Sequence, residues 1–225
     1  MIQNNLPFKI CFFILLLIGM NFFYAQNYQI LYKVDFRPKK ERYIFKTEYM
    51  CLETISNSKS IFYNFNNKKD SINEPRKDHI PYLKFTIIQT EKQYSYYGNF
   101  NDLYFAFTEP VKTQWKISAK TLHFKDYKVQ EAKLELDGRK WTALFAPEIP
   151  IISGPYKFSG LPGLIVKIFS EDGDYSFEMI KLTKHISNSY STFFPANKYI
   201  TVKKKKVETF IANFLKDPDH KILNW

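Results

Sequence analysis

Histidine is the side chain best suited to acid–base or zinc chemistry near neutral pH. The chain has four, at His79, His123, His185 and His220. They stand far apart, and neither an HExxH pattern nor a close pair of histidines occurs. A zinc site would need the fold alone to bring its ligands together. We therefore predict no metal site and no bound cofactor.

The acidic and hydroxyl side chains are no better arranged for catalysis. Residues 171–174 carry three carboxylates around one glycine, but the spaced ligands and terminal Glu of a calcium loop are missing. A hairpin turn explains this cluster better. Ser153 and Ser159 stand beside glycines without a nucleophile-elbow pattern. We predict no catalytic residue, and the sequence favours a protein that is not an enzyme.

Aromatic side chains are the other chemical resource of this chain. Phe, Trp and Tyr make up 18% of its 225 residues. Aromatic rings can line an apolar or peptide-binding groove, with tyrosine hydroxyls at its rim. They can equally fill the core of a β-sheet in a protein whose composition follows A- and T-rich codons. We favour the second interpretation.

A segment rich in proline and glycine, residues 147–168, must position some of these rings. Pro restricts φ and Gly permits positive φ, so the segment follows a fixed backbone path. Residues 161–164 match a type II turn, with Pro second and Gly third. The residues expected to have this structural role are Gly154, Pro155, Gly160, Pro162 and Gly163.

The same path aims apolar side chains, which gives the candidate ligand site. Its predicted residues are Trp141, Tyr156, Phe158 and Leu161. They either close the end of an open sheet or line a groove. We favour closure, because rigid apolar turns more often complete a core than bind a ligand.

Two Asp-Gly pairs, at 137–138 and 172–173, predict β-hairpins that frame this segment. Each pair separates two alternating runs, and Asp-Gly favours the positive φ that a two-residue hairpin turn requires. The predicted facing residues are Leu134–Trp141, Glu135–Lys140, Ile168–Phe177 and Lys167–Glu178. Apolar residues then share one face and opposite charges meet on the other.

Runs of β-branched and aromatic residues predict strands along most of the chain. These runs are 28–36, 43–55, 61–65, 80–89, 92–97 and 103–108, with a loop at 66–79 and a turn at 98–102. Helical spacing occurs at the C-terminus, at Val207, Phe210, Ile211 and Phe214, before Asp217-Pro218. We predict an all-β fold, a curved antiparallel sheet or open barrel with a short C-terminal helix.

The N-terminus is typical of a secretory signal peptide. Lys9 precedes an apolar run at 10–20, and Ala25 offers a small residue for cleavage before Gln26. The run is short for a membrane span, although a retained anchor is the alternative. We expect residues 1–25 to be the signal, residues 26–225 to be one β domain without a transmembrane span, and the protein to be periplasmic or secreted.

The net charge of +11 is carried mostly by lysine. Because the chain is expected to be exported, we exclude nucleic acid as the partner and retain an anionic envelope surface. Signal cleavage would leave Cys51 as the single cysteine, so no internal disulfide is expected. Its apolar neighbours predict a buried, inert thiol.

Residues 160–165, with the sequence GLPGLI, resemble the name motif of the GLPGLI family of exported Bacteroidota proteins. Residues 138–139, 147–150 and 154–155 also resemble that family's pattern, and the likeness covers roughly residues 128–182. Leu144 and Val129 depart from it, where a Trp and a Cys are expected. The resemblance implies an exported, mostly β protein of undetermined activity, found beside outer-membrane transport components.

Three functions remain open from the sequence. The first is a non-catalytic binding protein that holds a lipid, a peptide or a partner segment on an aromatic-lined face. The second is a structural accessory of an outer-membrane transport system. The third is a hydrolase whose site forms only in the fold. We favour the first, because expected export, aromatic content and the lack of a catalytic motif agree with it.

Overall fold

The structure, a computed structural model, describes residues 27–38, 44–56, 59–65, 81–100, 103–185 and 194–216. The predicted signal peptide, the predicted loop at 66–79 and the predicted helix stop at 217–218 lie outside these residues. So do His79 and His220, and the side chains of His185 and Phe214. No helix in the described part of the chain is long and apolar enough to cross a membrane.

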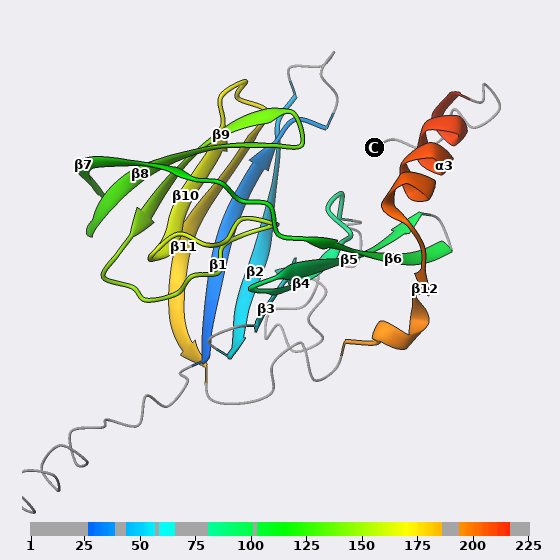
Figure 1. Cartoon of the computed structure of the whole chain (residues 1–225), viewed down its shortest axis with the longest axis horizontal. Helices are drawn as coiled ribbons and strands as arrows, with labels where there is room; N and C mark the ends of the chain where they lie inside the picture. Colours follow the sequence, from blue (N-terminus) through cyan, green and yellow to red (C-terminus); the bar gives the residue numbers. More distant parts are fainter. Residues whose placement is uncertain are drawn as a thin grey trace, which may run out of the picture.

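The described strands form one twelve-stranded sheet, built mainly from two runs that follow the sequence (Figure 1). The first run contains β1 (Asn27–Phe36), β2 (Lys46–Ser56), β3 (Lys59–Asn64), β4 (Thr86–Thr90), β5 (Gln93–Phe100) and β6 (Leu103–Pro110). The second run contains β7 (Lys116–Phe124), β8 (Tyr127–Leu136), β9 (Arg139–Ala146), β10 (Leu164–Ser170) and β11 (Tyr175–His185). Within each run every strand pairs antiparallel with the next, as expected for strands that are neighbours in sequence.

Pairing of β1 with β11 joins the two runs into a single curved sheet. Val34 lies opposite Phe177, and Lys33 lies opposite Glu178. The free sides of β6 and β7 stay apart, and the short β12 (Ile200–Thr201) adds to β6 in parallel. The predicted fold class, a curved and largely antiparallel sheet, is therefore confirmed in its open form.

The main core lies on the inner face of this curved sheet. Along β1, Ile30, Tyr32 and Val34 are fully buried and alternate with partly exposed residues, which is the period of two of a strand with one core face. The buried Tyr32 hydroxyl donates to the Ile165 carbonyl at 2.7 Å. This hydrogen bond ties the central strand to the start of β10.

The strands β2 and β3 are covered on both faces. Cys51, Ile61 and Tyr63 are fully buried in a second cluster on the opposite side from the main core, and Phe194 packs against it. The Tyr63 hydroxyl donates to Glu53 Oε1 at 2.6 Å. The prediction that Cys51 is a buried thiol is confirmed.

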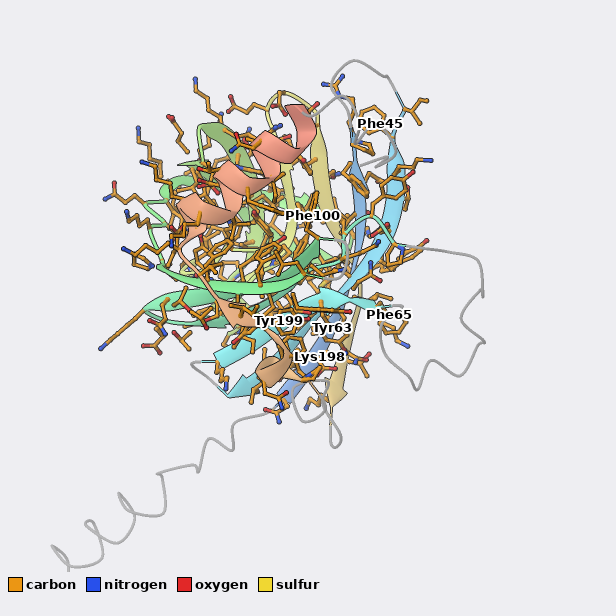
Figure 2. All side chains as sticks on the ribbon, turned by 90° about the vertical axis from the view of Figure 1, so that its right-hand side faces the viewer. Phe45, Tyr63, Phe65, Phe100, Lys198 and Tyr199 are labelled. Carbon is orange, nitrogen blue, oxygen red and sulfur yellow. The ribbon has the colours of Figure 1, made fainter. Side chains whose placement is uncertain are left out.

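The predicted C-terminal helix is confirmed as α3 (Lys204–Lys216), which lies beside β5 and β6 (Figures 1 and 2). It is preceded by the 3₁₀ turn η2 (Ala196–Lys198) and β12. Val207 joins the main core, and the Phe210 ring contacts the Phe100 ring at 5.6 Å between centroids. Phe210 is still 45% exposed, so the apolar stripe of the helix is only partly buried.

Both predicted hairpins form in the predicted register. The four facing pairs are Leu134–Trp141, Glu135–Lys140, Ile168–Phe177 and Lys167–Glu178. The β10–β11 hairpin lies between β9 and β1, so it is an inner part of the sheet. Its two faces differ in burial: Ile168 and Phe177 are buried in the main core, whereas Ile180 is 44% exposed.

The predicted start of the fourth strand is wrong. β4 begins at Thr86 instead of residue 80. The buried Glu48 carboxylate accepts the backbone N–H groups of Tyr82 at 2.5 Å and Leu83 at 3.1 Å. This buried side chain takes the hydrogen bonds that a strand ladder would use, which holds residues 81–85 outside the sheet.

The predicted turn at 98–102 begins later than expected. β5 continues through Gly98 to Phe100, in register with β6. A Cβ on Gly98 would lie 2.7 Å from the Tyr96 ring and 3.0 Å from the Phe105 ring. The glycine therefore leaves room for aromatic packing within a strand and does not mark a turn.

Candidate functional site

Residues 152–160 form a small hairpin over the inner face of the sheet. Ser153 pairs with Ser159, and the Gly160 N–H donates to the Ile152 carbonyl at 2.9 Å. The reversal lies at Pro155–Phe158, closed by a 3.1 Å hydrogen bond, as the Gly154-Pro155 pair predicts. Tyr156 has a positive φ of 55°, which turns its side chain sharply at the tip.

The predicted type II turn at Leu161–Leu164 does not form. A type II turn needs φ near about +80° at its third residue, but Gly163 has φ of 150°. The Gly163 N–H donates to the Leu161 carbonyl, and the Leu164 N–H donates to the Ile149 carbonyl at 3.0 Å. Because Ile149 accepts the Leu164 amide, the chain enters β10 directly beside β9.

The four predicted ligand residues divide into two pairs. Phe158 and Leu161 are 0% and 1% exposed and belong to the main core. Trp141 stacks edge-on against Phe158 at 4.7 Å between ring centroids. Trp141 and the partly exposed Tyr156 also border a pocket, where these two predicted residues can contact the same ligand.

This aromatic pocket has a volume of about 240 Å³. Its aromatic walls are Phe85, Trp141, Tyr156, Tyr175 and Phe177, and its aliphatic walls are Leu83 and Leu136. Asp137 and Arg139 add one charge of each sign. The lining comes from the segment before β4, the β8–β9 turn, β9, β11 and the 152–160 hairpin, so segments far apart in the sequence assemble it.

Trp141 contributes its ring to this pocket and not its polar atom. Its Nε1 is sealed from solvent and has no acceptor among the described residues. A buried donor without a partner costs about 1–3 kcal/mol, which the surrounding aromatic packing must offset. Since nothing of water size reaches this nitrogen, we interpret Trp141 as an apolar wall.

A buried lysine links the pocket to the C-terminal helix. Lys157 is 6% exposed, pairs with Asp137 at 2.9 Å, and lies over the rings of Tyr94 and Tyr156. Lys204 of α3 lies 3.5 Å from Asp137. Burial acts to raise the pKa of Asp137, but the two ammonium groups outweigh it and hold that pKa below its usual range.

A second charged group holds the β10–β11 turn. Arg139 pairs with Asp172 and Asp174, and its guanidinium lies 4.9 Å from the centre of the Tyr175 ring. Asp172 Oδ1 also accepts the Asp174 N–H and the Ser170 hydroxyl. The acidic cluster at 171–174 is therefore a hairpin turn with satisfied carboxylates, as the sequence predicts.

The tyrosines around the pocket stay neutral at physiological pH. Burial raises the pKa of Tyr94, Tyr96 and Tyr156 well above the usual value for tyrosine. Asp137 and Asp172 are ion-paired, with pKa values below their usual range. None of these groups exchanges a proton readily near pH 7.

Among the described residues only His123 has a described histidine side chain, and it does not line this pocket. His123 is exposed on β7, and the backbone of His185 ends β11. Among the described residues no group of three His, Cys, Asp or Glu side chains lies close enough to hold a metal ion. Sequence reasoning did not select Phe85, Tyr175 or Arg139 for this site; of these, only Arg139 stands beside a local motif, the Asp-Gly turn at 137–138.

We expect Asp137→Asn to lower the free energy of unfolding by about 1–3 kcal/mol, because the buried Lys157 ammonium then lacks its carboxylate. Asparagine keeps the shape and tolerates the positive φ of 52° at this turn. Urea denaturation at pH 7 measures the loss. The folded-state pKa of Asp137 is lowered, so the difference should shrink as the pH falls below about 4.

The matched control is Asp126→Asn in the exposed β7–β8 turn, which should change stability by less than about 0.5 kcal/mol. Adding Lys157→Met to Asp137→Asn should restore part of the loss, since the uncompensated charge is removed. Equal losses of stability in Asp126→Asn and Asp137→Asn would show that the Lys157–Asp137 ion pair does not stabilise the fold.

The fold and the pocket define an open, curved-sheet protein with an aromatic pocket on its inner face. Residues 47–167 match the model of a family described as "Protein of unknown function (Porph_ging)". This match spans more than half of the chain, and the chain belongs to that family. No curated protein matches the chain.

Solved structures similar to this chain include two of PNGF-II, in the C2 and P21 space groups. Their TM-scores are 0.60 and 0.59, at 15% and 16% identity, and each match covers 84% of this chain. The chain spans about a third, 33%, of the length of those structures. An uncharacterized conserved protein from Thermus thermophilus matches with a TM-score of 0.43, at 8% identity, over 80% of this chain and 92% of its own. At these identities the PNGF-II likeness shows the fold alone.

Proposed function

We propose that this protein is an exported, non-catalytic binding protein of the cell envelope. Its aromatic pocket holds one apolar side chain from a peptide or from a segment of a partner protein. The observation that carries the proposal is the pocket itself, with five aromatic rings around about 240 Å³ and one charge of each sign beside them. Aromatic walls with a few polar groups are characteristic of binding sites.

The size of the pocket selects among the ligands that the sequence left open. Pockets that enclose a drug-sized molecule measure about 300–1,000 Å³, and a cavity of about 150 Å³ holds one benzene ring. A pocket of about 240 Å³ therefore fits one aromatic or branched aliphatic side chain. It is too small to enclose a whole lipid, which favours the peptide or partner segment.

The charges beside the pocket support binding over catalysis. Asp137 and Arg139 are each held in ion pairs, so they offer fixed polarity to the backbone of a bound segment. The tyrosines remain protonated because burial raises their pKa values. The GLPGLI resemblance supplies the cell-envelope setting, and it makes an outer-membrane transport protein the first partner to examine.

The experiment is an NMR titration of the protein with N-acetyl-phenylalanine amide, which carries one aromatic side chain and no charge. We expect saturable shifts at Trp141 and Tyr156, with a dissociation constant near about 1 mM, equivalent to about −4 kcal/mol. Leu83→Trp should fill the pocket and remove these shifts. Leu103→Trp, at a position that is 43% exposed and far from the lining, is the matched control and should leave them unchanged.

Shifts that persist in Leu83→Trp, or no saturable shift in the unmodified protein, would contradict the proposal. Capture of the protein's partners from an envelope extract then tests whether it binds a protein of the cell envelope. The Leu83→Trp variant should lose any partner that the Leu103→Trp variant retains.

A further inference from the structure

The β8 strand has an unpaired edge close to the aromatic pocket. β7 pairs with β8 only as far as Lys116 opposite Lys133. Beyond this point residues 134–136 of β8 have β9 on one side, and no strand of the described residues pairs with their other side. Their outward backbone groups are therefore open to pair with an added strand.

The chain before β7 leaves this edge uncovered because it is anchored elsewhere. Residues 111–115 connect β6 to β7 and cross the inner face of the sheet (Figure 1). The Trp115 indole N–H donates to the Ser159 carbonyl at 2.7 Å, and Thr113 lies next to Gly160. The connection is thus bound to the 152–160 hairpin and stands away from β8.

A groove of about 710 Å³ fills the space between this connection and the β8 edge. We call it the β8 groove. Leu134 and Trp141 supply its apolar part, and each is 6% exposed. The volume is about three times that of the aromatic pocket, so it suits a stretch of backbone with side chains and not a single ring.

The β8 groove is basic. Four lysines line it against two glutamates: Lys112, Lys116, Lys133, Lys140, Glu135 and Glu171. Lys133 pairs with Glu171 at 3.8 Å. No carboxylate of the described residues lies within ion-pair distance of Lys112, Lys116 or Lys140. These three exposed ammonium groups are the charges that an acidic partner would meet.

We propose that the β8 groove binds an extended acidic peptide segment, which adds as a strand to the edge of β8. Its backbone pairs with residues 134–136, its carboxylates face the lysines, and an apolar side chain between them covers Leu134. Side chains alternate across a strand, so the segment has the pattern acidic–apolar–acidic. This proposal goes beyond the aromatic pocket; the two sites share the wall Trp141, and Leu136 at the end of the β8 edge also lines that pocket.

The test uses three end-blocked peptides with the purified protein: EVEVE, KVKVK, and EVEVE with every second backbone amide N-methylated. Calorimetry should show that EVEVE binds at least tenfold more tightly than the other two. Lysines opposite KVKVK repel it, and the methylated peptide cannot donate ladder hydrogen bonds. The affinity of EVEVE should fall as salt rises.

Two variants with matched charge locate the site. Lys112→Glu combined with Lys116→Glu should weaken EVEVE at least tenfold. Lys120→Glu combined with Lys128→Glu makes the same charge change farther along β7 and β8, outside the groove, and should weaken it less than threefold. Leu83→Trp, which fills the aromatic pocket, should leave EVEVE binding unchanged, so failure of one proposal is distinguishable from failure of the other.

Three results would overturn the proposal. Equal binding of EVEVE and its methylated form would exclude strand addition. Equal weakening by the two double variants would reduce the effect to general attraction of acidic peptides. The third result is self-association of the protein that EVEVE does not disrupt but that the Lys112/Lys116 double variant abolishes. It would show that a second copy of this chain, and not an acidic peptide, occupies the β8 groove.

Discussion

Replacing Gly163 with alanine should lower the free energy of unfolding by at least about 3 kcal/mol. A Cβ at this position would lie 2.3 Å from the Ala146 carbonyl oxygen and 2.7 Å from the Pro147 Cα. Both neighbours are backbone, so neither can rotate away. The φ of 150° is also one that side-chain-bearing residues rarely adopt, which adds strain. The chain would have to separate β10 from β9 to relieve the contact.

Gly138→Ala is the matched control, because this glycine also has positive φ, 72°, but no atom lies within 4 Å of its added Cβ. It should cost only the left-handed backbone penalty of about 1–2 kcal/mol. Urea denaturation followed by circular dichroism gives both values. A loss at Gly163 no larger than the loss at Gly138 would show that the contact with Ala146 is easily relieved.

The protein should lose stability steeply above pH 10. Burial raises the pKa values of Tyr32, Tyr63 and Tyr94 far above the usual value, while the same side chains ionise near pH 10 in the unfolded chain. A folded-state pKa raised above the unfolded value leaves stability intact below pH 10 and removes it as pH rises. Burial raises the pKa values of Tyr96 and Tyr156 in the same way, and five such groups give a slope of about 7 kcal/mol per pH unit.

Alkaline titration with two signals measures this effect. Absorbance at 295 nm reports tyrosinate, and circular dichroism reports the sheet. We expect the buried tyrosines to ionise in the same pH range in which the sheet unfolds. Tyr49, which is 43% exposed, provides the control: Tyr49→Phe should leave the slope unchanged, whereas Tyr32→Phe should reduce it by about a fifth. Ionisation of the buried tyrosines with the sheet intact would refute the prediction.

The parts of the fold that the sequence predicts correctly depend on neighbours in the chain. Asp-Gly turns and alternating apolar residues determine the hairpin registers at Leu134–Trp141 and Ile168–Phe177, because both partners lie within about ten residues. The errors arise where a distant residue competes. Glu48 takes the amides of Tyr82 and Leu83 and so delays β4. No local sequence pattern predicts that Glu48 will bind these amides.

In the candidate site, too, the sequence predicts the residues that local turns position and misses those that distant segments contribute. Trp141 and Tyr156 can be predicted from the sequence as candidate site residues, because a hairpin and a proline–glycine turn determine their positions. Phe85 and Tyr175 cannot, since they reach the pocket from segments whose adjacency depends on the long-range pairing of the sheet. Arg139 lies on β9 two residues before Trp141, so the same hairpin brings it to the pocket. Residue types alone predict a type II turn at 161–164, but the carbonyl of Ile149 accepts the Leu164 amide and selects a different geometry.

The position of β1 within the sheet sets the order in which the chain can complete its structure. β1 is the first described strand to be synthesised, and β2 can pair with one of its sides early. Its other side waits for β11, which begins at Tyr175. Until then, β1 and β10 each present an open edge, and the two halves of the sheet remain separate. Folding must therefore be slow relative to local hairpin formation, and it must finish after nearly the whole chain has been made or translocated.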